Sequence, residues 1–282
     1  MIRFRTRFLI VLCFFFFTGV SCSFAASYRL SMLPRYSTDE INLRVNALAK
    51  YLSSQTGLQI QGVVTSSFDK YVKKLQSGAV DIGFQNPYIY VLTSDKQEVI
   101  AIAEKGRDID KFRGIVVVPS NSDIRELKDL KGKRIAIVGF RSAGGYLSQK
   151  LTLLENGINV KEDCHLEIAP ENKQENVALA VFTGDVDAGF MRESALAQLE
   201  GMIPTGAVQV LSSTAWLPNW ALSVSRDMPA QDREKISKAI AALQHDDPVL
   251  KTLHLKGFRL AEDKDYDPVR KAAGLPLSTN DI

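Results

Sequence analysis

A seven-residue motif that occurs twice sets the strongest constraint on this chain. Residues 78–84 and residues 184–190 both read Gly-x-Val-Asp-x-Gly-Phe, and the two copies lie 106 positions apart. Each copy follows a helical pattern and leads into an apolar stretch typical of a buried strand. This separation is too long for a solenoid repeat. It predicts two similar α/β lobes with a cleft between them, where a ligand would bind.

The first 25 residues have the pattern of a secretory signal peptide. Residues 1–7 hold three arginines and no acid, residues 8–20 are apolar, and Ser23-Phe24-Ala25 supplies small residues at the positions that signal peptidase reads. We predict cleavage after Ala25 and a location in the periplasm. One alternative is a retained membrane anchor, although the apolar run is short for a span. The other is lipidation at Cys22, although the residues before it make a poor lipobox.

The positive net charge of the chain belongs to this N-terminal segment. The chain holds 35 Lys and Arg residues against 32 Asp and Glu residues, and three of the arginines lie in residues 1–7. The mature part is therefore neutral, which argues against binding to nucleic acid or to a membrane surface. Only Cys164 remains after cleavage, so no internal disulfide can form, and we expect a packed thiol there.

Strand-like and helix-like segments alternate along the mature chain. This alternation predicts an α/β fold in which each lobe has a mostly parallel sheet flanked by helices. We expect lobe one to comprise residues 27–119 and 216–282, and lobe two to comprise residues 120–215. Hinge crossings between the lobes are expected near residues 118–122 and 212–221.

Four loops are expected to line the cleft, because ligands bind beyond the carboxyl ends of parallel strands. They follow the first strand of each lobe and the two repeated strands. Three of them carry an arginine, namely Arg35, Arg141 and Arg192. A guanidinium group suits the oxygens of carboxylate, phosphate or sulfonate. The alternative for each arginine is a solvated or structural role.

Other polar and aromatic residues of these loops are candidates for ligand contact. Hydrogen bonding or stacking is expected from Tyr36, Gln85, Asn86, Tyr88 and Tyr146. Asn86 also precedes Pro87, which leaves a purely structural turn open. Trp216 and Trp220 flank Pro218 in the return crossing; core packing is the default for each, and we include Trp216 as a candidate for stacking.

Four further segments, taken in order, carry a resemblance to a known family. They are residues 75–83, residues 129–136 (Asp-Leu-Lys-Gly-Lys-Arg-Ile-Ala), the loop before Gly145-Tyr146-Leu147, and residues 265–270. With them the chain resembles, from about residue 28 to residue 270, the periplasmic phosphate, phosphite and phosphonate-binding proteins of ABC importers. The resemblance implies the two-lobed type II periplasmic binding protein fold, with hinge crossings between the lobes. It also implies an ABC permease in the membrane as partner.

The chain departs from the family pattern at the loop that opens the long helix of the second lobe. Family members that bind phosphonate present a Ser-Thr-Ser-Gly-Tyr loop there. Here the loop reads Ser142-Ala143-Gly144-Gly145-Tyr146, so Ser142 alone keeps a hydroxyl group, with Arg141 beside it. Ser142, Ala143 and Gly144 complete the expected ligand-binding set. We expect an anion, either a phosphonate-like oxyanion or a carboxylate.

Catalytic motifs are missing from the sequence. There is no Gly-x-Ser-x-Gly and no His-Glu-x-x-His, and the three histidines fall outside the cleft loops. We predict a monomeric binding protein without catalytic residues, metal or cofactor. It would capture a small anionic solute between closing lobes and deliver it to the permease. The alternative is a sensing module whose closed lobes signal to a membrane receptor kinase.

Overall fold

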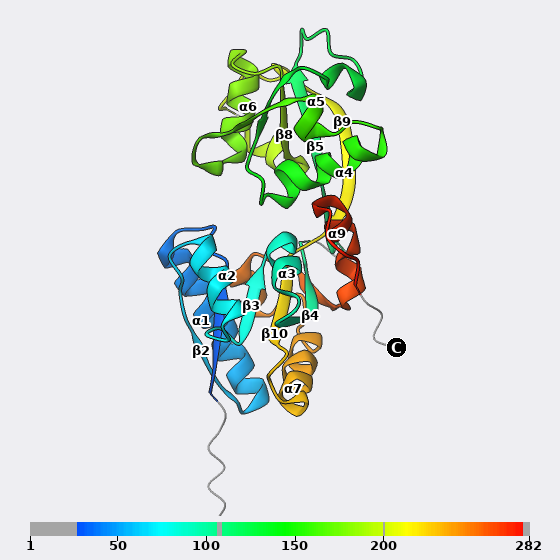
Figure 1. Ribbon diagram of the computed structural model, residues 1–282. Coiled ribbons are helices and arrows are strands. Elements are labelled where there is room, and N and C mark those ends of the chain that lie inside the picture. Colours follow the sequence, from blue (N-terminus) through cyan, green and yellow to red (C-terminus); the bar gives the residue numbers. More distant parts are fainter. Residues whose placement is uncertain (1–26, 106–108, 200, 279–282) are drawn as a thin grey trace, which may run out of the picture.

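The computed structural model describes residues 27–105, 109–199 and 201–278, which form two lobes (Figure 1). The predicted signal peptide lies outside these described residues. Within them, no helix has the length and apolar character needed to cross a membrane. The expected α/β architecture with two lobes is confirmed, because each lobe is built on its own sheet with helices against it.

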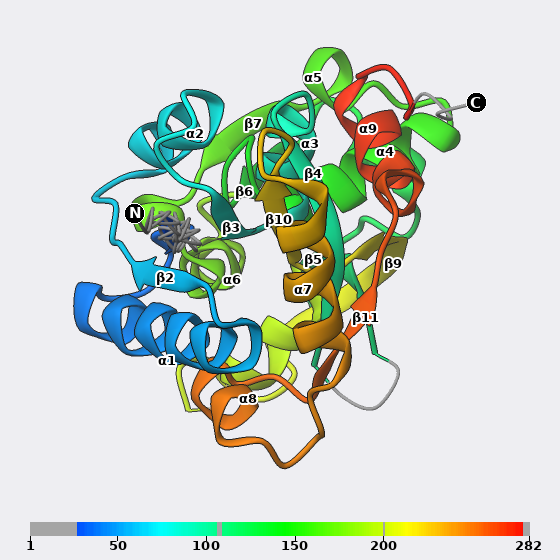
Figure 2. The ribbon, with the colours of Figure 1, turned by 90° about the horizontal axis from the view of Figure 1, so that it is seen from below.

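The sheet of the first lobe has six strands. In spatial order they are β11 (Gly257–Leu260), β4 (Gln97–Glu104), β10 (Ala221–Ser225), β3 (Ile82–Gln85), β1 (Ser27–Met32) and β2 (Gln59–Gly62). Helices flank this sheet on two sides (Figure 2). On one side α1 (Thr38–Thr56) packs with α7 (Ala230–Ala241) and α8 (Pro248–Leu253), and on the other α2 (Phe68–Gln76) packs with α3 (Pro87–Thr93).

The sheet of the second lobe has five strands. In spatial order they are β7 (His165–Ile168), β6 (Arg134–Ile137), β8 (Ala188–Arg192), β5 (Lys111–Pro119) and β9 (Val208–Pro218). Its helices are α4 (Ser148–Glu155), α5 (Val160–Asp163) and α6 (Gln174–Thr183). Short 3-10 helices occupy Leu127–Leu130, Pro170–Asn172, Glu193–Leu199 and Asp263–Tyr266.

Both sheets are mixed, which corrects the expectation of mostly parallel sheets. Strands β2, β1 and β3 are parallel to one another, as are β7, β6 and β8. The remaining pairs are antiparallel. The cause is the course of the chain between the lobes. Strand β10 returns from the second lobe and β5 enters it, so both run away from the cleft while their neighbours run toward it.

Strand β5 pairs with β8 and β9 in the second sheet, although the expected lobe boundary places residues 111–119 in lobe one. The chain therefore crosses between β4 and β5, ahead of the expected crossing at 118–122. It crosses back at residues 219–220, inside the expected range 212–221. The two crossings touch, because the backbone N–H of Asn219 donates to the carbonyl oxygen of Asp110 at 2.7 Å.

The C-terminal helix α9 (Asp267–Ala273) lies at the junction of the lobes (Figure 1). It packs against α3 of the first lobe and against α4 and β9 of the second. Just before it, the buried Tyr266 hydroxyl donates to the carbonyl oxygen of Asn219 at 3.0 Å, and its ring centroid lies 4.6 Å from that of Tyr90. This helix therefore ties the return crossing to both lobes.

Side-chain caps fix the loops at the cleft end of the strands. Ser37 caps α1, and the Asn86 side chain accepts from the backbone N–H of Ile89 at 2.8 Å to cap α3. Ser142 accepts from the N–H of Gly145 at 3.0 Å and opens a π-helical turn, Ala143–Leu147, that continues into α4. These caps satisfy N–H groups that a helix start leaves unpaired.

The buried Gln149 side chain ties this turn to the central strands. Its Nε2 atom donates to the carbonyl oxygens of Gly144, Ile115 and Met191 at 2.9 to 3.0 Å. Gly114 makes room for it, because a Cβ atom there would lie 2.2 Å from Nε2. One amide thus sets the position of the turn relative to β8, which carries Arg192.

We expect Gln149→Met to lower the free energy of unfolding by about 1–3 kcal/mol, because it leaves buried carbonyl oxygens without donors. Urea unfolding followed by circular dichroism measures the change. The matched control is Gln55→Met, an exposed position on α1, where the expected change is within about 0.5 kcal/mol. Equal effects at the two sites would contradict this role for Gln149.

Candidate functional site

A small cavity lies where the first lobe meets the end of β8. Its volume is about 20 Å³, which is room for roughly one water molecule. From the second lobe, Arg192 lines this cavity. The first lobe and the crossings supply the other lining residues: Met32, Arg35, Tyr36, Arg44, Phe84, Ala103, Lys105, Asn219, Trp220, Leu253 and Leu255.

Three cations of this cavity have no carboxylate partner among the described residues: Arg35, Lys105 and Arg192. The Lys105 ammonium donates to the carbonyl oxygen of His254 at 3.1 Å. The Arg192 guanidinium lies 4.1 Å from the centroid of the Phe112 ring, and its buried Nε atom has no hydrogen-bond partner. Arg35 and Lys105 are exposed to solvent and Arg192 is half-buried, and the arrangement leaves their positive charge uncompensated within the described residues.

The pKa values of two of these cations are lowered. Burial first, and then the charge of Arg35, lower the pKa of Arg192 to about 10. Burial, followed by the charges of Arg192, Arg44 and Arg35, lowers the pKa of Lys105 to about 8. Loss of water and mutual repulsion both disfavour the charged forms. An anion in the cavity would offset the repulsion between the cations.

Aromatic side chains and the ion-paired Arg44 pack around this cavity. Arg44 is buried and ion-paired with Glu40, and its Nη1 atom donates to the carbonyl oxygen of Leu253 at 3.3 Å. Its guanidinium lies 4.1 Å from the centroid of the Tyr36 ring, while that of Arg35 lies at 5.9 Å. The buried Trp220 ring packs beside Tyr36, with centroids 6.4 Å apart.

Arg141 lies outside the cavity and joins the lobes elsewhere. Its Nη1 atom donates to the carboxylate of Asp69 on α2 at 2.5 Å. The Asn86 side chain also reaches the second lobe, where its Nδ2 atom donates to the carbonyl oxygen of Arg141 at 3.5 Å. These two contacts span the cleft on the side of α2 and α3.

The turn after Arg141 is mostly buried. Ala143, Gly144 and Tyr146 are buried, and the hydroxyl of Tyr146 has no hydrogen-bond partner. Burial, and then the neighbouring Tyr88, raise the pKa of Tyr146 to about 12. Ser142 uses its oxygen as a cap, which leaves its hydrogen available to a ligand.

Nine of the twelve expected contact residues do not line the cavity. Besides Arg141, Asn86, Tyr88 and the turn at residues 142–146, they include Gln85 and Trp216. Gln85 is fully buried in the first lobe, where it accepts from the Tyr71 hydroxyl and donates to Ser223, each at 2.8 Å. Trp216 is 52% exposed, and the Arg113 guanidinium lies 4.9 Å from its ring centroid. The structure brings Arg35, Tyr36 and Arg192 together, and it adds Arg44, Lys105 and Asn219, which no sequence pattern singled out.

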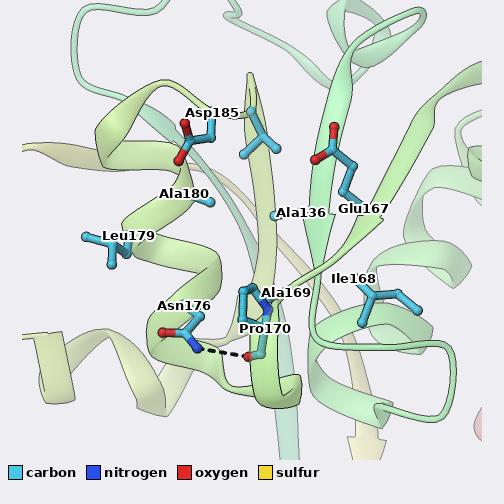
Figure 3. A pocket seen from close by; sticks show the side chains of 10 residues that line it. Ala136, Glu167, Ile168, Ala169, Pro170, Asn176, Leu179, Ala180 and Asp185 are labelled. Carbon is cyan, nitrogen blue, oxygen red and sulfur yellow. Dashed lines mark hydrogen bonds between the residues drawn. The ribbon is translucent and has the colours of Figure 1, made fainter.

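A larger cavity, of about 290 Å³, lies on the outer side of the second lobe between α6 and β7 (Figure 3). Small residues, including Ala136 and Ala180, form its floor, and Glu167 and Asp185 lie at its rim. Its lining contains no cation. The cleft cavity is smaller, yet it is the one whose charge suits an anion.

A family model described as "ABC transporter, phosphonate, periplasmic substrate-binding protein" matches residues 30–266. The chain belongs to this family. This confirms the resemblance stated from the sequence, and it confirms a substrate-binding protein of an ABC transporter family rather than an enzyme.

One curated relative is the phosphate-import protein PhnD of Mycolicibacterium smegmatis, which is 26% identical over 178 residues. The match covers 59% of this chain and 55% of the relative, so the chain spans about half the length of the curated protein that it matches.

Solved structures share the fold at low sequence identity. PhnD1 of Prochlorococcus marinus, in complex with methylphosphonate, has a TM-score of 0.69 at 18% identity, over 88% of this chain and 97% of that one. A Xanthomonas citri protein bound to ATP has a TM-score of 0.74 at 18% identity, over 88% and 96%. At these identities the likeness shows the fold alone, and it confirms the two-lobed architecture.

The arginines of the cavity should differ in their effect on stability. Arg44→Gln should lower the free energy of unfolding by about 1–3 kcal/mol, because it leaves buried partners unpaired. Arg35→Gln should change it by less than about 0.5 kcal/mol or raise it, because it relieves repulsion. Urea unfolding of the ligand-free protein at low salt measures both. Equal losses in the two variants would contradict the division into framing and ligand-facing arginines.

Proposed function

We propose that this protein captures a small anionic solute between its lobes and delivers it to an ABC permease. The observation that carries the proposal is the cavity in which Arg35, Lys105 and Arg192 lie without carboxylate partners among the described residues. A phosphonate-like oxyanion is the first candidate and a carboxylate the second. Family membership, the methylphosphonate complex of PhnD1 and the phosphate-import role of the mycobacterial relative all support an oxyanion.

Recognition in this proposal depends on guanidinium and ammonium groups rather than on hydroxyl groups. The turn at residues 142–146 offers one serine hydroxyl, that of Ser142, beside buried Ala143 and Gly144, and the hydroxyl of Tyr146 at its other end is buried. Arginine compensates for this, because its planar fork of N–H donors matches two oxygens of one anion. Ser142 and the N–H groups of the turn could add donors from the second lobe.

Capture in this proposal couples to movement of the lobes. The cavity has room for about one water molecule, so a larger solute fits only when β8 and the first lobe move apart. An anion held between Arg192 and the cations of the first lobe favours the closed state, because it bonds to both lobes only there. The adjoining crossings at Asp110 and Asn219 are suited to act as the hinge.

A thermal-shift panel on the chain from Ser27 onward tests the proposal. It contains phosphate, phosphite, methylphosphonate, methyl phosphate, sulfate, sulfonates, dicarboxylates and amino acids at constant ionic strength. A ligand at 100 times its Kd should stabilise the protein by about 2.7 kcal/mol. Stabilisation by one class of anion supports the proposal. No stabilisation by any anion would overturn it.

Arg192→Gln should weaken binding of the anion found in that panel by about 1.5–3 kcal/mol, or roughly ten- to a hundredfold. Arg141→Gln should act in the same direction but more weakly, because Arg141 lies outside the cavity and its pair with Asp69 joins the two lobes. Isothermal titration calorimetry measures both, and circular dichroism verifies folding. The control is Arg125→Gln, an exposed position after β5 at the end of the sheet away from the cleft. Unchanged affinity in both cleft variants would remove these arginines from the site.

Affinity should also fall as the pH rises above about 8. In the ligand-free protein, the surrounding protein atoms and the charges of Arg192, Arg44 and Arg35 lower the pKa of Lys105 to about 8, although its side chain is exposed to solvent; Glu104 precedes it on the chain. An anion favours the charged ammonium, so binding raises this pKa and takes up a proton. The affinity is therefore level below the ligand-free pKa and falls above it.

Titrations with methyl phosphate between pH 7 and pH 9.5 measure this dependence, because a phosphate monoester with a second pKa near 6 stays a dianion there. The expected loss approaches tenfold per pH unit above about pH 8. Lys105→Gln should bind more weakly at pH 7 and show a flat profile. A wild-type profile that is flat throughout would exclude Lys105 from the ligand's surroundings.

A further inference from the structure

We propose that the cleft selects its ligand by number of charges, taking a fully deprotonated anion with two or more negative charges in preference to a monoanion. This inference rests on the proposed function, because it concerns the same cavity. It separates phosphate monoesters, phosphonate dianions and dicarboxylates from sulfonates, sulfate monoesters and monocarboxylates.

The first argument is that some cations near the cleft have a carboxylate partner and others do not. Arg44, Arg113 and Arg141 each have a carboxylate partner, in Glu40, Glu193 and Asp69 respectively. Arg35, Lys105 and Arg192 line the cavity and have no such partner in the described part of the chain. Acids are therefore available near the cleft, and they are placed on the arginines that frame it.

The second argument concerns the charge left after binding. One negative charge among three positive ones leaves two of them unbalanced, whereas a dianion leaves one. The interaction of an anion with Arg192 is larger here than in water, because Arg192 is partly shielded from solvent and its guanidinium lies over the ring of Phe112. A second negative charge on the ligand is attracted by all three cations that line the cavity, and most strongly by Arg192.

The third argument concerns hydrogen-bonding type. Three buried atoms of the cavity residues have no hydrogen-bond partner, Nε of Arg44, Nε of Arg192 and Nδ2 of Asn219, and all three are donors. The side-chain oxygen of Asn219 is already engaged by the backbone N–H of Trp220 at 3.1 Å. A protonated ligand oxygen needs an acceptor, and this lining offers mainly donors and apolar groups such as Met32 and Leu255. The arrangement favours ligand oxygens that carry no hydrogen.

The experiment compares ligands of matched shape that differ by one charge. Methyl phosphate and methyl sulfate form one pair, and succinate and succinamate, its monoamide, form the other. Competition or calorimetric titration of the wild-type protein at pH 7.5 and constant ionic strength gives the ratio of affinities within each pair. We expect the dianion to bind at least roughly tenfold more tightly in the pair that fits the cavity.

Variants connect this ratio to the cations. Arg35→Gln and Lys105→Gln each remove one positive charge and should reduce the preference for the dianion several-fold. Arg125→Gln, remote from the cleft, should leave it unchanged. A reduction in the two cavity variants alone supports selection by charge.

The outcomes separate this inference from the proposed function. Equal affinity within the pair that binds, or tighter binding of the monoanion, would overturn selection by charge while anion capture stands. A preference for the dianion that neither cavity variant reduces would also overturn it. Failure of every ligand in the four-compound set and in the anion panel would overturn the proposed function itself.

Discussion

The contact between the two chain crossings is the constraint from which the architecture follows. Asp110 and Asn219 meet through one backbone hydrogen bond, and Arg259 pairs with Asp110 at 2.6 Å while Tyr266 bonds to Asn219. Because the chain passes between the lobes here, β5 and β10 run away from the cleft and antiparallel to their neighbours. Strands β1, β3, β6 and β8 then all end at the cleft, and their loops carry the candidate site.

The duplicated motif predicted the fold well because it marks equivalent strands. Both copies become central strands, β3 and β8, at the same relative place in their sheets. The lobe membership of β5 could not be read in the same way. A strand that is apolar almost throughout suits either sheet, and periodicity describes burial but not the neighbouring strand. Only the pairing with β8 and β9 decides it.

The candidate site was predictable where a loop follows a parallel strand, which is how Arg35 and Arg192 were found. Lys105 also follows a strand that runs toward the cleft, but that strand leads into a crossing whose place the sequence did not reveal. Gln85 shows the opposite error. It ends β3, yet its side chain points into the first lobe, where Tyr71 and Ser223 satisfy it. The direction of one side chain at a strand end depends on packing that sequence patterns do not record.

The cavity also shows why the candidate site stands out from the rest of the protein. Elsewhere near the cleft each arginine meets a carboxylate, an arrangement that holds the ligand-free fold together. At Arg35, Lys105 and Arg192 the protein instead gathers like charges and lowers the pKa of two of them. Such an arrangement costs stability, and a fold keeps it where the charge has a use outside the fold. In the proposed function, the ligand supplies the negative charge and the acceptor oxygens that neighbouring carboxylates supply to the other arginines.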